Sequence, residues 1–186
     1  TATSLNSRGP LAVDANGNLY FDDANRIRRW EPLTGLVTTI AGTGSASSSG
    51  DGGPAVSASL CTVSGLTVDK DGNVYIAEQG CGQRVRRIDA ATKVISTIAG
   101  SASAGFAGDG GSAANALFQG VNGLVVIGSS LFIADSGNHR VRRIDLNSMT
   151  IATVAGNGQC CYGGDGGVAT AAQVGSPIHL GAIGDK

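Results

Sequence analysis

The chain has 186 residues, of which 41% are hydrophobic and 15% are charged, so it is large and apolar enough for one globular domain and is not a disordered tail. The formal net charge is −1 and aromatic residues make up 4%, which excludes the basic surface and the stacking platform that nucleic-acid binding requires. No apolar run approaches the roughly 20 residues that span a bilayer, so no membrane span is expected.

One sequence pattern occurs three times between Leu11 and Val174. Each copy contains an arginine-rich run, then a short apolar run (TTIAG, STIAG or ATVAG), and then the tetrapeptide GDGG. The arginine-rich runs begin at Arg26, Arg84 and Arg140, which gives a period of 58 and then 56 residues. A regular period of this length is typical of repeat proteins, in which each unit buries its apolar face against its neighbours.

Four short β-strands are predicted in each copy, separated by turns rich in Gly, Asn and Asp. The arginine-rich run supplies the third strand, and the other strands are expected at Leu11–Asp14, Leu19–Phe21 and Val37–Ala41, at Leu66–Asp69, Val74–Ile76 and Val94–Ala99, and at Leu124–Ile127, Leu131–Ile133 and Ile151–Ala155. A single small antiparallel sheet cannot bury both faces, so these four-stranded meanders are expected to pack on one another as β-propeller blades. The predicted fold is all-β, with a core that includes Val13, Val68, Val126, Tyr20, Tyr75 and Phe132.

The order GLTVDKDGNVYIAEQG, RVRRID, STIAG and GDGG resembles the NHL repeat, the blade unit of NHL-type β-propellers. The segment LFIADSGNHRVRRID at 131–145 follows that pattern most fully, whereas the first copy has a shorter loop before its third strand and the third copy lacks the DKDGN turn. The resemblance implies one repeat domain over 1–186, with blades at approximately 7–60, 61–118 and 119–174 and the first strand of a further blade at 175–186. NHL propellers close with about six blades, so three imply a partial propeller or one completed by assembly.

Acidic residues in the turns are weak candidates for calcium ligands. Asp69 and Asp71 in DKDGN, and Asp109 in GDGG, present hard oxygen atoms. Tight turns prefer the same residue types, and no distal bidentate glutamate follows. We therefore expect no cofactor, and we expect the GDGG aspartates to hydrogen-bond within their own loops.

One acidic residue precedes each arginine-rich run, in register with its first arginine. Such pairs can satisfy charges at the edge of a blade, because arginine offers a planar, bidentate donor. Thirteen basic and fourteen acidic residues nearly balance, which disfavours an anion-binding ring of arginines. The predicted structural pairs are Asp23 with Arg26, Glu78 with Arg84, and Asp135 with Arg140.

The four cysteines favour an extracellular or cell-surface protein. The start of the first strand and the end of the second lie at the same edge of a hairpin, so Cys61 and Cys81 are predicted to form a disulfide bond. Cys160 and Cys161 could bond to each other or to another chain, and their partner stays open.

The sequence contains no Cys-x-x-Cys, His-Glu-x-x-His or Gly-x-Ser-x-Gly motif, so no enzyme is predicted. We expect a non-catalytic structural or interaction module, secreted or displayed at the cell surface. Ile178, Leu180 and Ile183 would lie on an open strand edge, through which copies associate, including head to tail into a polymer, unless further blades of a longer chain cover it. The alternative is a fragment of an NHL-type enzyme or ligand-binding protein with its site on the propeller axis.

Overall fold

Three four-stranded antiparallel sheets form the body of the protein in the computed structural model, which describes residues 9–182. The strands of each sheet follow one another in chain order, so each sheet is a meander. They are β1 (Leu11–Val13), β2 (Leu19–Asp22), β3 (Ile27–Trp30) and β4 (Val37–Ala41) in blade 1, β5 (Thr62–Val68), β6 (Val74–Gln79), β7 (Gln83–Ile88) and β8 (Ile95–Ser101) in blade 2, and β9 (Val121–Ile127), β10 (Ser130–Asp135), β11 (Arg140–Asp145) and β12 (Thr150–Ala155) in blade 3. This architecture confirms the predicted all-β fold of propeller blades.

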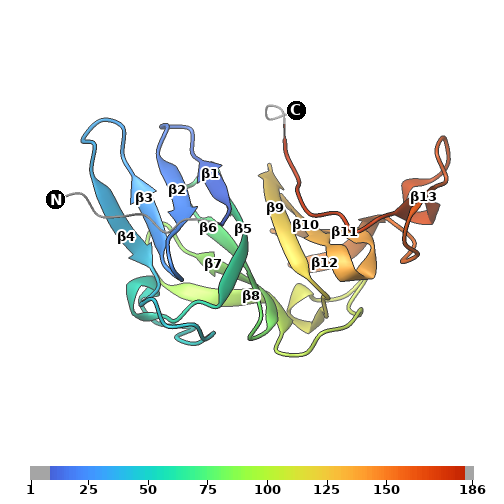
Figure 1. The fold of residues 1–186 in the computed structure, drawn as a ribbon, viewed down its shortest axis with the longest axis horizontal. Coiled ribbons are helices and arrows are strands. Elements are labelled where there is room, and N and C mark those ends of the chain that lie inside the picture. Colours follow the sequence, from blue (N-terminus) through green and yellow to red (C-terminus); the bar gives the residue numbers. More distant parts are fainter. Residues whose placement is uncertain (1–8, 183–186) are drawn as a thin grey trace.

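The blades follow one another along an open arc (Figure 1). β1 contacts β5 and β5 contacts β9, so the first strands of the three blades lie side by side. The loops between the blades each carry one turn of 3-10 helix, η1 (Ala55–Ser57) and η2 (Ala113–Asn115), and a further turn, η3 (Ser136–Asn138), joins β10 to β11. After blade 3, the chain forms a small sheet of β13 (Tyr162–Gly163) and β14 (Gln173–Val174), with η4 (Ala169–Ala171) between them.

Aspartates close the first hairpins of blades 1 and 2. In blade 2, Asp69 Oδ1 accepts hydrogen bonds from the backbone N–H groups of Asp71 and Asn73, at 3.0 and 2.8 Å. Gly72 adopts a φ of +84°, a conformation in which a side chain is strained. The DKDGN sequence therefore acts as a turn that sets the register between β5 and β6.

The apolar core lies between neighbouring blades, with one buried cluster joining blades 1 and 2 and another joining blades 2 and 3. Tyr20 and Tyr75 are buried as predicted. Three more of the predicted core residues, Val68, Val126 and Phe132, are partly buried. The last one, Val13, is 62% exposed, so the prediction that it belongs to the core is wrong. Its strand, β1, packs against a neighbouring blade on one side only within the described residues.

The segment after β14 lies beside β9 without forming a strand up to residue 182. The Ile178 carbonyl accepts a hydrogen bond from Gly123 N at 2.8 Å, and the Pro177 carbonyl accepts one from Ser136 Oγ. Val121 of β9 receives the corresponding hydrogen bonds from blade 2, through Ser64 Oγ and Gln79 Nε2. The segment thus follows the path of a next inner strand without forming one, and it already uses the Ile178 carbonyl to bind β9. Association of copies through Ile178 and Leu180 stays a prediction. Ile183, part of the same prediction, lies outside the described residues.

Candidate interaction site

A buried arginine lies at the centre of blade 2. Arg86, whose side chain is 1% exposed, has its Nη1 at 3.5 Å from Glu78 Oε1 on the neighbouring strand and its Nη2 at 2.7 Å from Asp51 Oδ1. The same guanidinium donates to the carbonyls of Ser49 and Ser59 at 3.0 and 3.1 Å. A guanidinium removed from water needs this many acceptors, because burial of an unpaired charge is strongly unfavourable.

Blade 3 repeats this arrangement around Arg142, whose side chain is 0% exposed. Its Nη1 lies 3.4 Å from Asp135 Oδ2 and its Nη2 lies 2.7 Å from Asp109 Oδ1. Phe106 adds a cation–π contact, with its ring centroid 4.8 Å from the guanidinium carbon. Each arginine is therefore held by one acid of its own blade and one acid from the loop that precedes the blade.

The second acid of each set links two blades. Asp51 lies in the GDGG tetrapeptide that follows blade 1, yet it binds Arg86 and accepts a hydrogen bond from Thr97 Oγ1 of β8 at 2.6 Å. Burial raises the pKa of Asp51, but the hydrogen bonds from Thr97 and Arg86 outweigh it, so the pKa lies below its usual value. The expectation that these aspartates bond within their own loops is wrong for Asp51 and Asp109, since both carboxylates reach the next blade.

The predicted pairing of acids with the first arginine of each run is wrong in blades 2 and 3. Arg84 lies directly opposite Glu78 in the strand register but donates to Ser48 Oγ at 2.9 Å. Arg140 donates to the carbonyls of Asn138 and Asn157 instead of Asp135. The acids pair with the arginine two residues later because that side chain is the buried one, and a buried cation needs an anion most.

Blade 1 and the last GDGG loop each contain part of the same arrangement. Arg28 occupies the position of Arg86 and pairs with Asp23 at 3.4 Å, whereas Arg26 donates to the Thr43 carbonyl. The Arg28 Nε atom is buried and has no hydrogen-bond partner among the described residues. In the loop after blade 3, the Asp165 carboxylate is exposed and accepts a hydrogen bond from the Tyr162 hydroxyl.

The predicted disulfide between Cys61 and Cys81 is confirmed, with the Cα atoms 5.9 Å apart. The bond ties the residue before β5 to the loop after β6, at one edge of blade 2. Cys160 and Cys161 are exposed free thiols whose sulfur atoms are 3.0 Å apart. The hydrogen bond that the Cys161 thiol makes with Cys160 raises the pKa of Cys161.

The weak calcium candidates do not come together. Asp69 binds turn amides and the Tyr75 hydroxyl at 3.0 Å, and Asp71 pairs with Lys70 at 2.8 Å. Asp109 is engaged by Arg142 in a different loop. Within residues 9–182, no group of three or more His, Cys, Asp or Glu side chains is placed to hold a metal ion.

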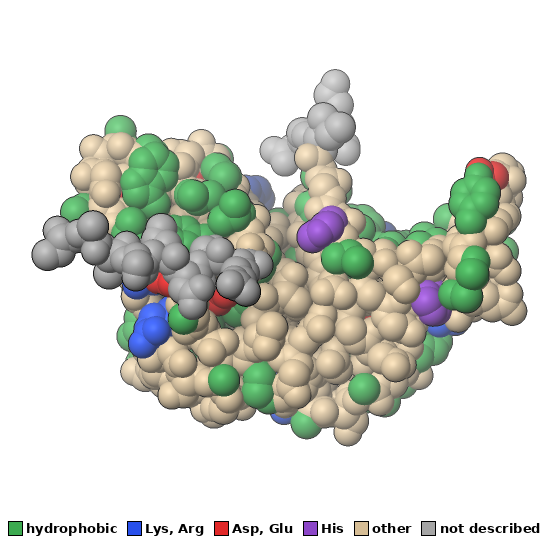
Figure 2. Space-filling view, in the orientation of Figure 1, with side chains coloured by type: hydrophobic (Ala, Val, Ile, Leu, Met, Phe, Trp, Pro, Cys, Tyr) green, Lys and Arg blue, Asp and Glu red, His purple; other side chains and the backbone are tan. Residues whose placement is uncertain are grey.

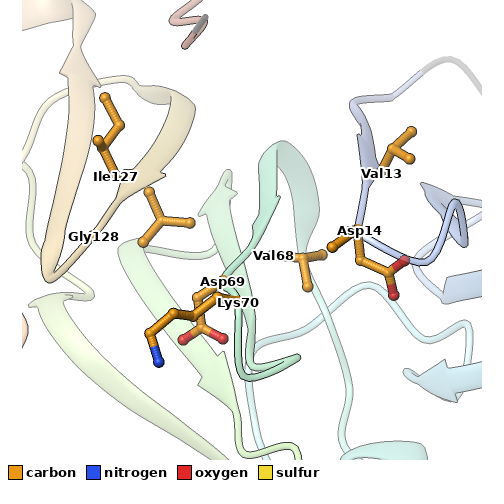
Figure 3. A pocket seen from close by; sticks show the side chains of 9 residues that line it. Val13, Asp14, Val68, Asp69, Lys70, Ile127 and Gly128 are labelled. Atoms are coloured by element: carbon orange, nitrogen blue, oxygen red, sulfur yellow. The ribbon is translucent and has the colours of Figure 1, made fainter. Parts of the chain in front are cut away.

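A hollow of about 520 Å³ lies where the first strands of the three blades end (Figure 3). Its lining residues come from the ends of β1, β5 and β9, and they are Val13, Asp14, Ala15, Val68, Asp69, Lys70, Val126, Ile127 and Gly128. Asp14 and Asp69 already accept hydrogen bonds from the hydroxyls of Tyr20 and Tyr75, at 3.1 and 3.0 Å. Burial and the Asp69 carboxylate raise the pKa of Tyr75, so this hydroxyl remains a donor.

Exposed apolar side chains gather at the two ends of the arc, over β1–β4 and around β13 (Figure 2). The large ones at these ends are Leu11, Val13, Trp30, Leu33, Leu36 and Val37 in blade 1 and Tyr162 and Val168 after blade 3. The two ends of the arc are therefore the surfaces with the clearest capacity to bind another protein.

None of the helices in the described part of the chain has the length and apolar character needed to cross a membrane.

Among known proteins, two teneurins resemble part of the chain. Teneurin-3 from Mus musculus is 37% identical over a stretch that covers 49% of this chain and 4% of that protein. Teneurin-1 from Gallus gallus gives the same identity and the same coverage. The chain thus corresponds to a small part of these relatives. No protein-family model matches the chain, so the NHL assignment rests on the sequence pattern and stays a prediction.

Solved structures resemble nearly the whole chain. A Bacteroides thetaiotaomicron protein of unknown function superposes with a TM-score of 0.70 at 25% identity, over 91% of this chain and 40% of that one. A Bacteroides ovatus auxiliary nutrient binding protein superposes with a TM-score of 0.62 at 17% identity, over 94% of this chain and 42% of that one. The chain thus spans less than half of either protein, and the likeness shows a propeller-type fold.

Proposed function

We propose that this chain is a non-catalytic protein-interaction module of an extracellular or cell-surface protein, and that it works by joining its blades to further blades. Copies of the chain, or additional blades of a longer protein, provide the partner surface. The teneurin similarity and the propeller-type fold support an interaction module rather than an enzyme. The same acids that line the hollow between the first strands are engaged in turns, which supports a structural role for them.

The observation that carries this proposal is the change in burial along the repeat. Ile95 of β8 and Ile151 of β12 are 0% and 1% exposed, whereas Val37 at the same position of blade 1 is 39% exposed. The two buried residues are covered by the loop of the preceding blade, through backbone hydrogen bonds. A partner that supplies such a loop would bury the exposed position in the same way.

The disulfide between Cys61 and Cys81 supports an oxidising location. Expression of the chain behind a secretion signal should deliver it to the medium with these two residues linked, as measured by mass spectrometry of non-reduced peptides. Retention of the chain in the cell with both thiols free would contradict the extracellular part of the proposal.

Sedimentation velocity tests the interaction part. The purified 186-residue chain should sediment as a species larger than its 18.4 kDa monomer as its concentration rises through the micromolar range. A monomer at all concentrations would remove self-association from the proposal and leave only further blades of a longer chain as the partner.

A further inference from the structure

The same junction connects blade 1 to blade 2 and blade 2 to blade 3. In the first junction, Asp51 Oδ1 accepts hydrogen bonds from Arg86 Nε and Nη2 at 3.0 and 2.7 Å, and Asp51 Oδ2 accepts one from Thr97 Oγ1 at 2.6 Å. In the second junction, Asp109 accepts hydrogen bonds from Arg142 Nε at 2.9 Å and from Thr153 Oγ1 at 2.6 Å. The repetition shows that these contacts belong to the blade-to-blade interface itself.

The backbone of each loop also joins the outer strand of the next blade. In the first junction, Gly52 N donates to the Ile95 carbonyl at 2.8 Å, Ile95 N donates to the Gly53 carbonyl at 3.1 Å, and Ala55 N donates to the Lys93 carbonyl at 2.9 Å. The second junction repeats all three hydrogen bonds, with Gly110, Gly111 and Ala113 against Ile151 and Met149. The loop thus pairs with the outer strand as an added short strand would.

The receiving half of this junction is exposed on blade 1. Arg28, Val37 and Thr39 occupy the positions of Arg86, Ile95 and Thr97. The Arg28 Nε atom, which would correspond to the donors in the other blades, is buried without a described partner. Val37 is 39% exposed and Thr39 is exposed. Blade 1 therefore has an arginine, a threonine and an outer strand ready for a loop that the described residues do not supply.

The donating half is exposed at the other end of the chain. Gly164 and Gly166 adopt φ values of +89° and +78°, close to the +90° and +81° of Gly50 and Gly52 in the first junction. Asp165 between them is exposed, and so is Ala169, whereas the equivalent alanine of the first loop, Ala55, is 1% exposed. The loop already has its binding conformation, so little ordering cost opposes docking.

We propose that the 164–169 loop of one copy of this chain docks on β3 and β4 of a second copy, with Asp165 bound by Arg28 and Thr39. This assignment rests on the proposed function and gives it a defined interface and partner. The two halves lie at opposite ends of the arc, so they cannot meet within one copy (Figure 1). A second copy is the favoured occupant because one chain carries both complementary halves, with opposite charges and matching backbone partners.

Charge reversal tests the junction by sedimentation velocity. Arg28→Asp and Asp165→Arg each place like charges at every junction between identical copies, so each variant alone should associate at least tenfold more weakly. An equimolar mixture of the two variants can form one junction in which both charges are exchanged and another that keeps the original pair. The mixture, and the double variant Arg28→Asp/Asp165→Arg, should regain association.

Exposed charges elsewhere provide matched controls. Arg143→Asp and Asp71→Arg change charge by the same amounts outside the junction and should associate like the unmodified chain. Arg28→Asp places a second carboxylate beside that of Asp23, so circular dichroism must show that the variant folds. If it does not, Asp165→Arg and Ala169→Glu, both at exposed positions, carry the test.

The outcomes separate the two proposals. Association that all junction variants leave unchanged would overturn this junction while leaving an interaction module in place. A chain that stays monomeric at every concentration would overturn the second copy as the occupant. Loss in both single variants with recovery in their mixture is the result that supports the junction, because nonspecific association would not depend on this pairing.

Discussion

Blade 2 and blade 1 share a strand order and an arginine-rich run, but they differ in how completely their outer strands are covered. In blade 2 the central arginine is 1% exposed and binds acids from two directions, whereas Arg28 of blade 1 is 18% exposed and its ion pair comes from one direction. The difference arises from the loop of the preceding blade, which blade 2 receives and which, within the described residues, blade 1 does not. A blade of this type is therefore completed by its neighbour rather than by its own residues alone.

The largest expected difference in stability between the two blades comes from removing their central arginines. Arg86→Ala leaves the buried Glu78 carboxylate without its cation and should lower the free energy of unfolding by about 3–5 kcal/mol. Arg28→Ala should cost about 1 kcal/mol, because Asp23 is less buried and the second acid is missing. Urea denaturation followed by circular dichroism measures both. Equal losses would mean that the preceding loop adds nothing to the stability of blade 2.

The outer-strand residues give a second contrast that does not involve charge. Ile95→Ala removes a fully buried side chain and should destabilise the protein by about 2–4 kcal/mol. Val37→Ala, at the same position of blade 1, should cost about 0.5 kcal/mol or less. The same denaturation experiment reads both variants. In an assembly joined through blade 1, the cost of Val37→Ala should rise with protein concentration, and a constant cost would argue against burial of Val37 by a partner.

The disulfide is a link that blade 2 has and blade 1 lacks. Cys61→Ser/Cys81→Ser should lower the free energy of unfolding by about 2–4 kcal/mol, because the bond closes a loop over a sequence separation of 20 residues in the unfolded chain. The unmodified chain in a reducing agent should lose a similar amount, measured by thermal melting. A reducing agent that lowers the melting temperature of the double serine variant equally would point instead to Cys160 and Cys161.

The smallest expected effect concerns an acid that blade 1 alone contains. Asp22 stands where blades 2 and 3 have the buried residues Ala77 and Ala134, and burial together with the neighbouring Asp23 charge raises its pKa to about 6. A pKa raised on folding gives stability that is present at low pH and is lost as the pH rises through 6. Asp22→Ala should therefore stabilise the protein by about 1–2 kcal/mol at pH 7, after solvent screening of this half-buried group, and by much less at pH 4.

Thermal melts of the two proteins at pH 4 and pH 7 check this prediction. Asp71→Ala serves as the control, because Asp71 is exposed and its removal leaves the core unchanged. A stabilisation of Asp22→Ala that is the same at both pH values would mean that it arises from packing and not from ionisation.

The repeat made the fold predictable from the sequence. Three copies of one pattern fixed the number of strands in each blade, and the hairpin edge brought Cys61 and Cys81 together. The burial of Tyr20 and Tyr75 followed from their place in the short apolar runs that form the second strands. These features depend on contacts within a blade or between identical neighbours, which a repeating sequence displays directly.

The candidate site was harder to predict from the sequence because it depends on contacts between blades. Within one blade, Arg84 and Arg86 lie on the same face and either could pair with Glu78, so the sequence pattern did not decide between them. The choice between the two arginines depends on Asp51, which comes from the loop after the previous blade and binds Arg86. One signal was present in the sequence: the GDGG aspartates recur with the same period as the arginines, as residues in a shared contact would.

The disulfide also determines how the row of three blades would transmit a pulling force. Tension applied through blade 1 would reach blade 2 at Cys61 and pass across the bond to Cys81, bypassing the hairpin of β5 and β6. The roughly 19 enclosed residues would span about 65 Å if extended, and the intact bond withholds this length from the stretched chain. β5, which lies between the first strands of blades 1 and 3, would thus stay in place under a load that could extend either neighbour.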